Sequence, residues 1–170
     1  PMMQGEFNMA IRITEYRNGI KVGSIIRDMQ INVVTCNNAP PVLSVPGDTC
    51  VEAGSNLTFT VSASDANGNL VTLTATGGPL IVPSSPAVFP QPAVGLSFAS
   101  SVFSWQTNCS HVRKSPYQMV FKATDNGQPV NLADLQSMNI TVVAPAPKNL
   151  TASPLGNRIE LTWDKEVCTN

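Results

Sequence analysis

Apolar and polar residues alternate in one short stretch after another, and this pattern constrains the fold more than any other feature of the sequence. Residues 57–63 (LTFTVSA), 71–75 (VTLTA) and 117–123 (YQMVFKA) each place an apolar residue at every second position. A period of two puts successive side chains on opposite faces of a strand, so each stretch predicts a half-buried β-strand. Fourteen prolines and eleven glycines punctuate the chain. We therefore expect an all-β protein of short antiparallel strands joined by turns.

Residues 1–35 are predicted to be the C-terminal strands of a preceding β-sandwich domain. Apolar residues alternate over 7–13, and Asn18-Gly19 is typical of a tight hairpin turn because Asn and Gly tolerate positive φ. One strand or a pair of strands over 20–34 is expected to complete the hairpin. Two or three strands do not bury a core by themselves, so this part is expected to belong to a larger domain.

Residues 36–144 are expected to form the one complete domain. They hold about seven alternating stretches in roughly 105 residues, which is typical of an antiparallel β-sandwich. Residues 77–95 (GGPLIVPSSPAVFPQPAVG) contain five prolines and are predicted to be a long surface excursion with one short edge strand. Pro40 and Pro41 fix φ and are expected to stiffen the junction with the preceding domain.

Residues 145–170 are predicted to be the N-terminal strands of a further sandwich. In the stretch NRIELTWD, Ile159, Leu161 and Trp163 alternate with polar residues and are expected to point inward. Trp105, within the central domain, alternates in the same way, so both tryptophans are interpreted as core residues; exposed sugar-binding platforms are the alternative. The whole chain is thus predicted to be a run of tandem sandwiches, the outer two incomplete.

Several stretches resemble known extracellular domains. PKNLTASPLGNRIELTWD (147–164) resembles the opening of a fibronectin type III domain. NNAPPVLSVPGDTCVEAGSNLTFTVSASDANG (37–68) and YQMVFKATDNG (117–127) resemble cadherin-like and polycystic-kidney-disease-type immunoglobulin-like domains. FNMAIRITEYRNGIKVGSIIRDMQINVV (7–34), FSWQTNCSHVRKSPYQMVFKATDNG (103–127) and APAPKNLTASPLGNRIELTWD (144–164) look similar to large surface proteins of Bacteroidetes that carry a gliding-motility-associated sorting domain for type IX secretion. The resemblance implies a secreted or cell-surface location.

The cadherin-like resemblance raises the question of a calcium site. In an immunoglobulin-like sandwich the loops after the second and sixth strands share one pole, where the chain also enters. Oxygen ligands at that pole suit calcium, and the candidates are Asp65, Asn67, Asp125, Asn126 and, from the linker, Asn38. The linker lacks the acids of the cadherin linker, which implies weak binding. The alternative is that these residues cap their own turns through side-chain hydrogen bonds.

The four cysteines are not spaced as a zinc site or a CxxC redox pair. In the sandwich topology Cys50 and Cys109 both belong to the pole opposite the candidate calcium ligands, so we predict a Cys50–Cys109 disulfide. Cys36 and Cys168 are expected to pair with residues outside this sequence, and a direct bond between them is rejected because it would span a whole domain.

Composition and motifs point away from catalysis and from two classes of partner. Only 12% of residues are charged and the net charge is −1, so the chain lacks a nucleic-acid-binding footprint. It also lacks an apolar run of about 18 residues for membrane insertion. His111 is the only histidine, no acid is placed to orient it toward Ser110, and we interpret it as a surface-loop residue. We expect no catalytic residue and no cofactor other than calcium.

The sequence as a whole predicts a non-catalytic structural or adhesive segment of a secreted or cell-surface bacterial protein. It would act as a stiff spacer between neighbouring domains of the same chain and present a part that binds a surface glycan or protein. The alternative is a carbohydrate-binding accessory module of a secreted polysaccharide-degrading enzyme.

Overall fold

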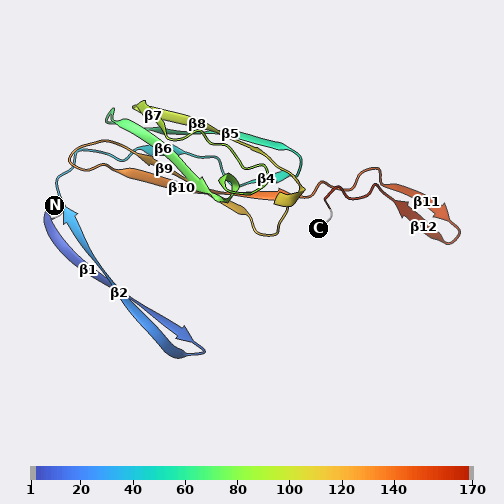
Figure 1. Ribbon diagram of the computed structural model, residues 1–170, viewed down its shortest axis with the longest axis horizontal. Helices are drawn as coiled ribbons and strands as arrows, with labels where there is room; N and C mark the ends of the chain where they lie inside the picture. The colour runs from blue at the N-terminus through green and yellow to red at the C-terminus, as the bar shows by residue number, and fades with distance from the viewer. Residues whose placement is uncertain (1–2, 169–170) are drawn as a thin grey trace. The chain divides into compact units, whose positions relative to one another are not determined.

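The computed structural model describes residues 3–168 and confirms the all-β prediction (Figure 1). Its regular structure consists of β-strands and two short 3-10 helices. The chain divides into two compact units, Pro1–Asn37 and Asn38–Asn170. Within the described residues no helix is long and apolar enough to cross a membrane.

The first unit is a long antiparallel hairpin of β1 (Gly5–Arg17) and β2 (Ile20–Val33). Its turn is the predicted one, and both turn residues have positive φ, 49° for Asn18 and 78° for Gly19. Of the two possibilities for 20–34, one strand or a pair, the structure has one continuous strand. Pairing in register places apolar side chains opposite one another on one face, where they stay 41% to 57% exposed: Phe7, Met9, Ile13, Ile25, Met29 and Ile31.

The second unit contains a β-sandwich of eight strands, where alternation predicted about seven. One sheet has the order β4 (Thr49–Glu52), β10 (Ala133–Val143), β9 (Tyr117–Thr124), β6 (Leu70–Gly77), β7 (Ala93–Leu96). The other has the order β3 (Val42–Ser44), β5 (Asn56–Ser64), β8 (Phe98–Gln106). Neighbouring strands are antiparallel, except that β4 pairs with β10 in parallel.

The sandwich core forms where the alternating residues of the two sheets meet. Phe103, Trp105 and Phe121 are fully buried, as the alternation predicted. Phe59 stacks on Phe103 at a centroid distance of 4.6 Å and meets Phe121 edge-on at 6.3 Å. Burial of an aromatic or aliphatic side chain contributes about 1.5 to 3 kcal/mol, so these rings hold the two sheets together.

The proline-rich segment 77–95 is only in part the surface excursion that was predicted. Its end forms the expected short edge strand, β7. The middle is not peripheral: Phe89 is 5% exposed and lies 5.5 Å from Phe121, centroid to centroid. Val88 exchanges two backbone hydrogen bonds with Ser104 of β8. The segment therefore covers part of the edge of β8 and contributes to the core, because the three-stranded sheet alone leaves that edge open.

The last part of the chain forms a two-stranded hairpin of β11 (Thr151–Leu155) and β12 (Arg158–Thr162). The prediction that Ile159, Leu161 and Trp163 point into a core is wrong here, since they are 71%, 53% and 55% exposed. The alternation is present, but no second sheet covers this hairpin among the described residues. Trp105, in contrast, is the core residue that was expected.

Candidate functional site

Two groups of loops, at opposite ends of the sandwich strands, contain the residues singled out in the sequence. The linker pole comprises residues 38–39, the loop 65–69 after β5 and the loop 125–132 after β9. The disulfide pole comprises the turn 52–55, the loop 107–112 after β8 and residues 167–168. Antiparallel pairing explains the separation, because β5 and β9 both end at the linker pole and β8 ends at the other.

Asn38 joins the two loops of the linker pole. Its side-chain Nδ2 donates to Asp125 Oδ2 at 2.7 Å. Its Oδ1 accepts from Asn69 Nδ2 at 2.6 Å. The next residue is held as well, because the Ala39 N–H donates to Asn67 Oδ1 at 2.7 Å. The first residues of the second unit are therefore fixed to the sandwich from both sheets.

Asp125 is 3% exposed and organises its own loop. Its Oδ1 accepts from the backbone N–H groups of Gly127 at 3.0 Å and Leu132 at 2.7 Å. Burial raises the pKa of Asp125, but the hydrogen bonds from Leu132, Gly127 and Asn38 outweigh it and hold the pKa below its usual range. The ionised carboxylate is thus the form that this loop is built around.

A depressed pKa in the folded state makes stability depend on pH. Asp125 contributes its stabilisation above its unfolded-state pKa of about 3.9, and the contribution is lost as the pH falls through the lower folded-state value. We expect the unfolding free energy of the 170-residue chain to drop on acidification below about pH 4. The Asp125→Asn variant should lose less over the same range. Urea unfolding at a series of pH values checks this, and identical pH slopes for the two proteins would contradict it.

Asp65 is 6% exposed and caps the loop after β5. Its Oδ1 accepts from the N–H groups of Asn67 and Asn69, both at 2.9 Å. Its Oδ2 is buried and has no hydrogen-bond partner among residues 3–168. Asn126, in the other loop, accepts from the Leu70 N–H at 2.9 Å. Side-chain oxygens of both loops thus accept backbone N–H groups at this pole.

All five candidate calcium ligands lie at the linker pole, and each takes part in a side-chain hydrogen bond. Asp65 and Asp125 each accept a hydrogen bond from the backbone N–H two residues later, which is the bond of an Asx turn. Such turns are the alternative that the sequence left open. Among residues 3–168 no group of three or more His, Cys, Asp or Glu side chains is placed to hold a metal ion.

Two residues of the linker pole were missed in the sequence. Asn69 bonds to Asn38, and its place two residues after Asn67 is the only local signal. Gly127 is buried, and a Cβ built on it would overlap the side-chain amide of Asn38. A glycine is required there because Asn38 fills the space that a side chain would occupy.

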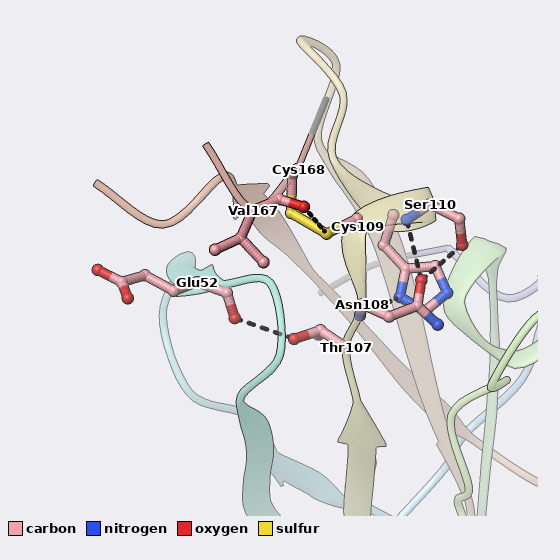
Figure 2. The surroundings of a disulfide bond; sticks show 8 residues. Glu52, Thr107, Asn108, Cys109, Ser110, Val167 and Cys168 are labelled. Carbon is pink, nitrogen blue, oxygen red and sulfur yellow. Dashed lines mark hydrogen bonds between the residues drawn. A yellow bond between two sulfur atoms is a disulfide. The ribbon is translucent and has the colours of Figure 1, made fainter. Parts of the chain in front are cut away.

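The predicted Cys50–Cys109 disulfide is wrong, because Cys109 bonds to Cys168 (Figure 2). The expectation that Cys168 pairs outside the sequence is therefore also wrong. Val51 of β4 packs against the core, so its neighbour Cys50 points to the outer face of the sheet, where it remains an exposed free thiol. The segment after β12 instead brings Cys168 to the loop after β8, with the two Cα atoms 5.1 Å apart.

The loop that carries Cys109 is held by its own hydrogen bonds. Asn108 caps the 3-10 helix η2 (Cys109–His111) by accepting from the Ser110 N–H at 2.9 Å. Thr107 is 1% exposed, and its hydroxyl lies 3.0 Å from the Glu52 carbonyl (Figure 2). The same hydroxyl lies 2.7 Å from the Ser55 carbonyl. Cys109 is thus anchored to the turn before β5.

His111 is not the surface-loop residue that was predicted, since it is 2% exposed. Its Nδ1 accepts from the Asn108 N–H at 3.1 Å, which leaves the proton on Nε2, and this atom donates to the Ser84 carbonyl at 2.7 Å. The ring lies 4.9 Å from that of Trp105. The Ser110 hydroxyl donates to Asn108 Oδ1 rather than to the imidazole. The hydrogen bonds of His111 and Ser110 therefore hold the loop 107–112 in place.

No protein-family model matches the chain, and no curated protein matches it. Solved structures do resemble it. They include the sialic acid binding region of a Streptococcus sanguinis adhesin (12% identity, 63% of this chain and 30% of that chain, TM-score 0.43). Others are AggA, the major subunit of aggregative adherence fimbriae type I from Escherichia coli (13% identity, 64% and 98%, TM-score 0.46), and domains 4 and 5 of the S-layer protein SbsC (16% identity, 85% and 60%, TM-score 0.37). This chain thus spans less than a third of the first of these proteins. Similarity at this level identifies neither a ligand nor a partner.

Proposed function

We propose that the chain is a non-catalytic spacer segment of a secreted or cell-surface protein, and that its sandwich sets the chain direction at both ends. The observation that carries the proposal is the linker pole. Asn38 and Ala39 are bonded to loops of both sheets, at 2.6 to 2.7 Å. A chain that enters a domain through such bonds, followed by Pro40 and Pro41, has little freedom to swing. At the other end, the disulfide fixes the segment that leaves the sandwich.

Two further features support a role as a spacer rather than as an enzyme or a carbohydrate-binding module. The histidine and the neighbouring serine are engaged in structural hydrogen bonds. A sugar platform needs exposed rings, whereas most aromatic rings of the sandwich are buried: Phe89, Phe103, Trp105, Tyr117 and Phe121. Trp163 is exposed, but it lies just beyond β12, outside the sandwich. By the resemblance noted in the sequence, the proposal extends to a type IX-secreted surface protein of the gliding-motility-associated kind, whose distal part binds a glycan or protein.

The proposal also includes a calcium ion bound at the linker pole. A buried carboxylate oxygen without a partner is costly, and Asp65 Oδ2 is such an atom. A cation beside it would remove that cost. The amide oxygens of Asn38, Asn67 and Asn126 belong to the same pole, and amide oxygens are among the ligands that calcium takes in proteins. With two carboxylates, the affinity would be on the order of millimolar.

Thermal unfolding of the 170-residue chain in chelator and in about 10 mM calcium tests this. A ligand with a Kd of about 1 mM that binds only the folded state adds about 1.4 kcal/mol, which raises the midpoint by a few degrees. Asp65→Asn keeps an oxygen for the two N–H groups but removes the charge, so it should abolish the rise. Asp48→Asn, an acid outside the pole, is the matched control and should keep it. Equal midpoints with and without calcium in the wild-type chain would show that hydrogen bonds alone hold the pole.

A further inference from the structure

The disulfide closes a large covalent loop at one end of the sandwich. Cys109 and Cys168 are 59 residues apart in sequence, and the loop between them contains β9, β10, β11 and β12. If the chain is pulled from its two ends, tension that arrives at Cys168 passes through the S–S bond to Cys109. The backbone between the two cysteines then lies outside the covalent path of the load.

We propose that the Cys109–Cys168 bond is a load bypass, which keeps the backbone of residues 110–167 out of the covalent path of the load and directs the load into the three-stranded sheet. The biological use of such a bypass rests on the proposed spacer function, because a spacer at a cell surface is the part that is pulled. The bypass itself is a property of this chain's connectivity and fold.

The route of the load follows from the strand register. On one side tension enters through Asn38 and reaches β3, whose first residue Val42 pairs with Ser64 of β5. On the other side it enters at Cys109, just beyond the end of β8, where Gln106 pairs with Asn56 of β5. β3 and β8 flank the same strand, and the load pulls on their opposite ends. The hydrogen bonds of this sheet are therefore sheared together rather than opened one at a time.

Without the bond the load would take another route. It would enter the sandwich at Val143, the end of β10 in the five-stranded sheet. β10 is linked to β3 through side chains, because the Leu43 N–H donates to Asp134 Oδ2 at 2.9 Å and Gln136 Nε2 donates to the Leu43 carbonyl at 3.0 Å. The disulfide thus moves the loaded end of the sandwich from one sheet to the other.

The point where the load enters is reinforced. The loop around Cys109 is joined to neighbouring segments by the Thr107 hydroxyl, by His111 to Ser84, and by the Tyr117 hydroxyl, which donates to the His111 carbonyl at 3.1 Å. These bonds spread tension from Cys109 to the turn before β5 and to the segment before β7.

Single-molecule pulling measures the sheltered length directly. The 170-residue chain, oxidised, would be placed between reporter domains of known unfolding length and stretched until it unfolds. At about 3.3 to 3.6 Å per residue the loop hides about 200 Å of extended chain. Cys168→Ser should therefore release about 200 Å more than the wild type, whereas the control Cys50→Ser should match the wild type. Equal lengths for the wild type and Cys168→Ser would overturn the bypass.

A second measurement does not depend on the folding of a variant. The wild-type chain is unfolded and held at constant force in the presence of a small thiol. The thiolate attacks one sulfur of the loaded bond and forms a mixed disulfide with it, and the other cysteine leaves as a thiolate. Each such event should lengthen the chain by one further step of about 200 Å. Absence of this step would overturn the proposal. If the disulfide withholds the expected length of about 200 Å but the sandwich unfolds at very low force, the load bypass is supported and the proposed stiff spacer is contradicted.

Discussion

Replacing Cys168 by serine is expected to lower the free energy of unfolding by about 4 kcal/mol. The bond closes a loop of 59 residues, and the chain-entropy model assigns about 4 kcal/mol to closing a loop of that length in the unfolded state. Cys168 also packs against the hydrophobic core. Since domains are stable by only about 5 to 15 kcal/mol, this is a large part of the total. Urea unfolding of the oxidised chain and the variant measures it.

The free thiol supplies the control for that experiment. Cys50→Ser changes an exposed residue outside the disulfide, so its effect should stay within about 0.5 kcal/mol. Adding a reductant should destabilise the wild type to the level of Cys168→Ser and leave Cys168→Ser unchanged. If Cys168→Ser changed the unfolding free energy by less than about 1 kcal/mol, the bond would not have the structural role described here.

Replacing Gly127 by alanine is expected to cost about 2 to 3 kcal/mol by displacing a side chain on another segment. The added methyl group would occupy the position of the Asn38 amide. Asn38 would have to move, and Asp125 Oδ2 and Asn69 Nδ2 would each lose a hydrogen-bond partner. Losing the donor to a buried carboxylate costs about 1 to 3 kcal/mol, and the loss at Asn69 adds to it. Urea unfolding checks the value.

Gly47→Ala is the matched control. Nothing lies within 4 Å of a Cβ built on Gly47, so the same chemical change there should alter stability by no more than about 0.5 kcal/mol. A Gly127→Ala variant as stable as Gly47→Ala would mean that Asn38 does not occupy the space beside Gly127.

The sequence predicted the fold correctly where local side-chain alternation alone determines the structure. Alternation predicted the strands and the buried Trp105 because side chains on a pleated strand point to opposite faces. The same rule gave the wrong result for Trp163, where a period of two fixes only which face a side chain is on. Whether that face is covered depends on another part of the chain. Phe89 is the opposite case, since a proline-rich segment becomes part of the core by packing against Phe121.

For the two groups of loops, too, the sequence predicted the local features and missed the contacts between distant segments. Asp65 and Asp125 each follow a strand and precede a turn, so their capping bonds and their common pole could be inferred. The partners of Cys109 and His111 could not, because they depend on how segments far apart in sequence return to the same loop. Cys168 is 59 residues from Cys109, and Ser84 is 27 residues from His111. No local spacing indicates such pairs.

The central claim is that residues 38–39 are fixed to the sandwich, and amide hydrogen exchange at Ala39 tests it most directly. Pro40 and Pro41 have no N–H group, so Ala39 is the reporter for this stretch. Its N–H donates to Asn67 Oδ1, and we expect it to exchange at least about tenfold more slowly than in an unstructured peptide. In Gly127→Ala the protection should be lost while the core strands keep theirs. Exchange of Ala39 in the wild-type chain at the rate of an unstructured peptide would contradict the account.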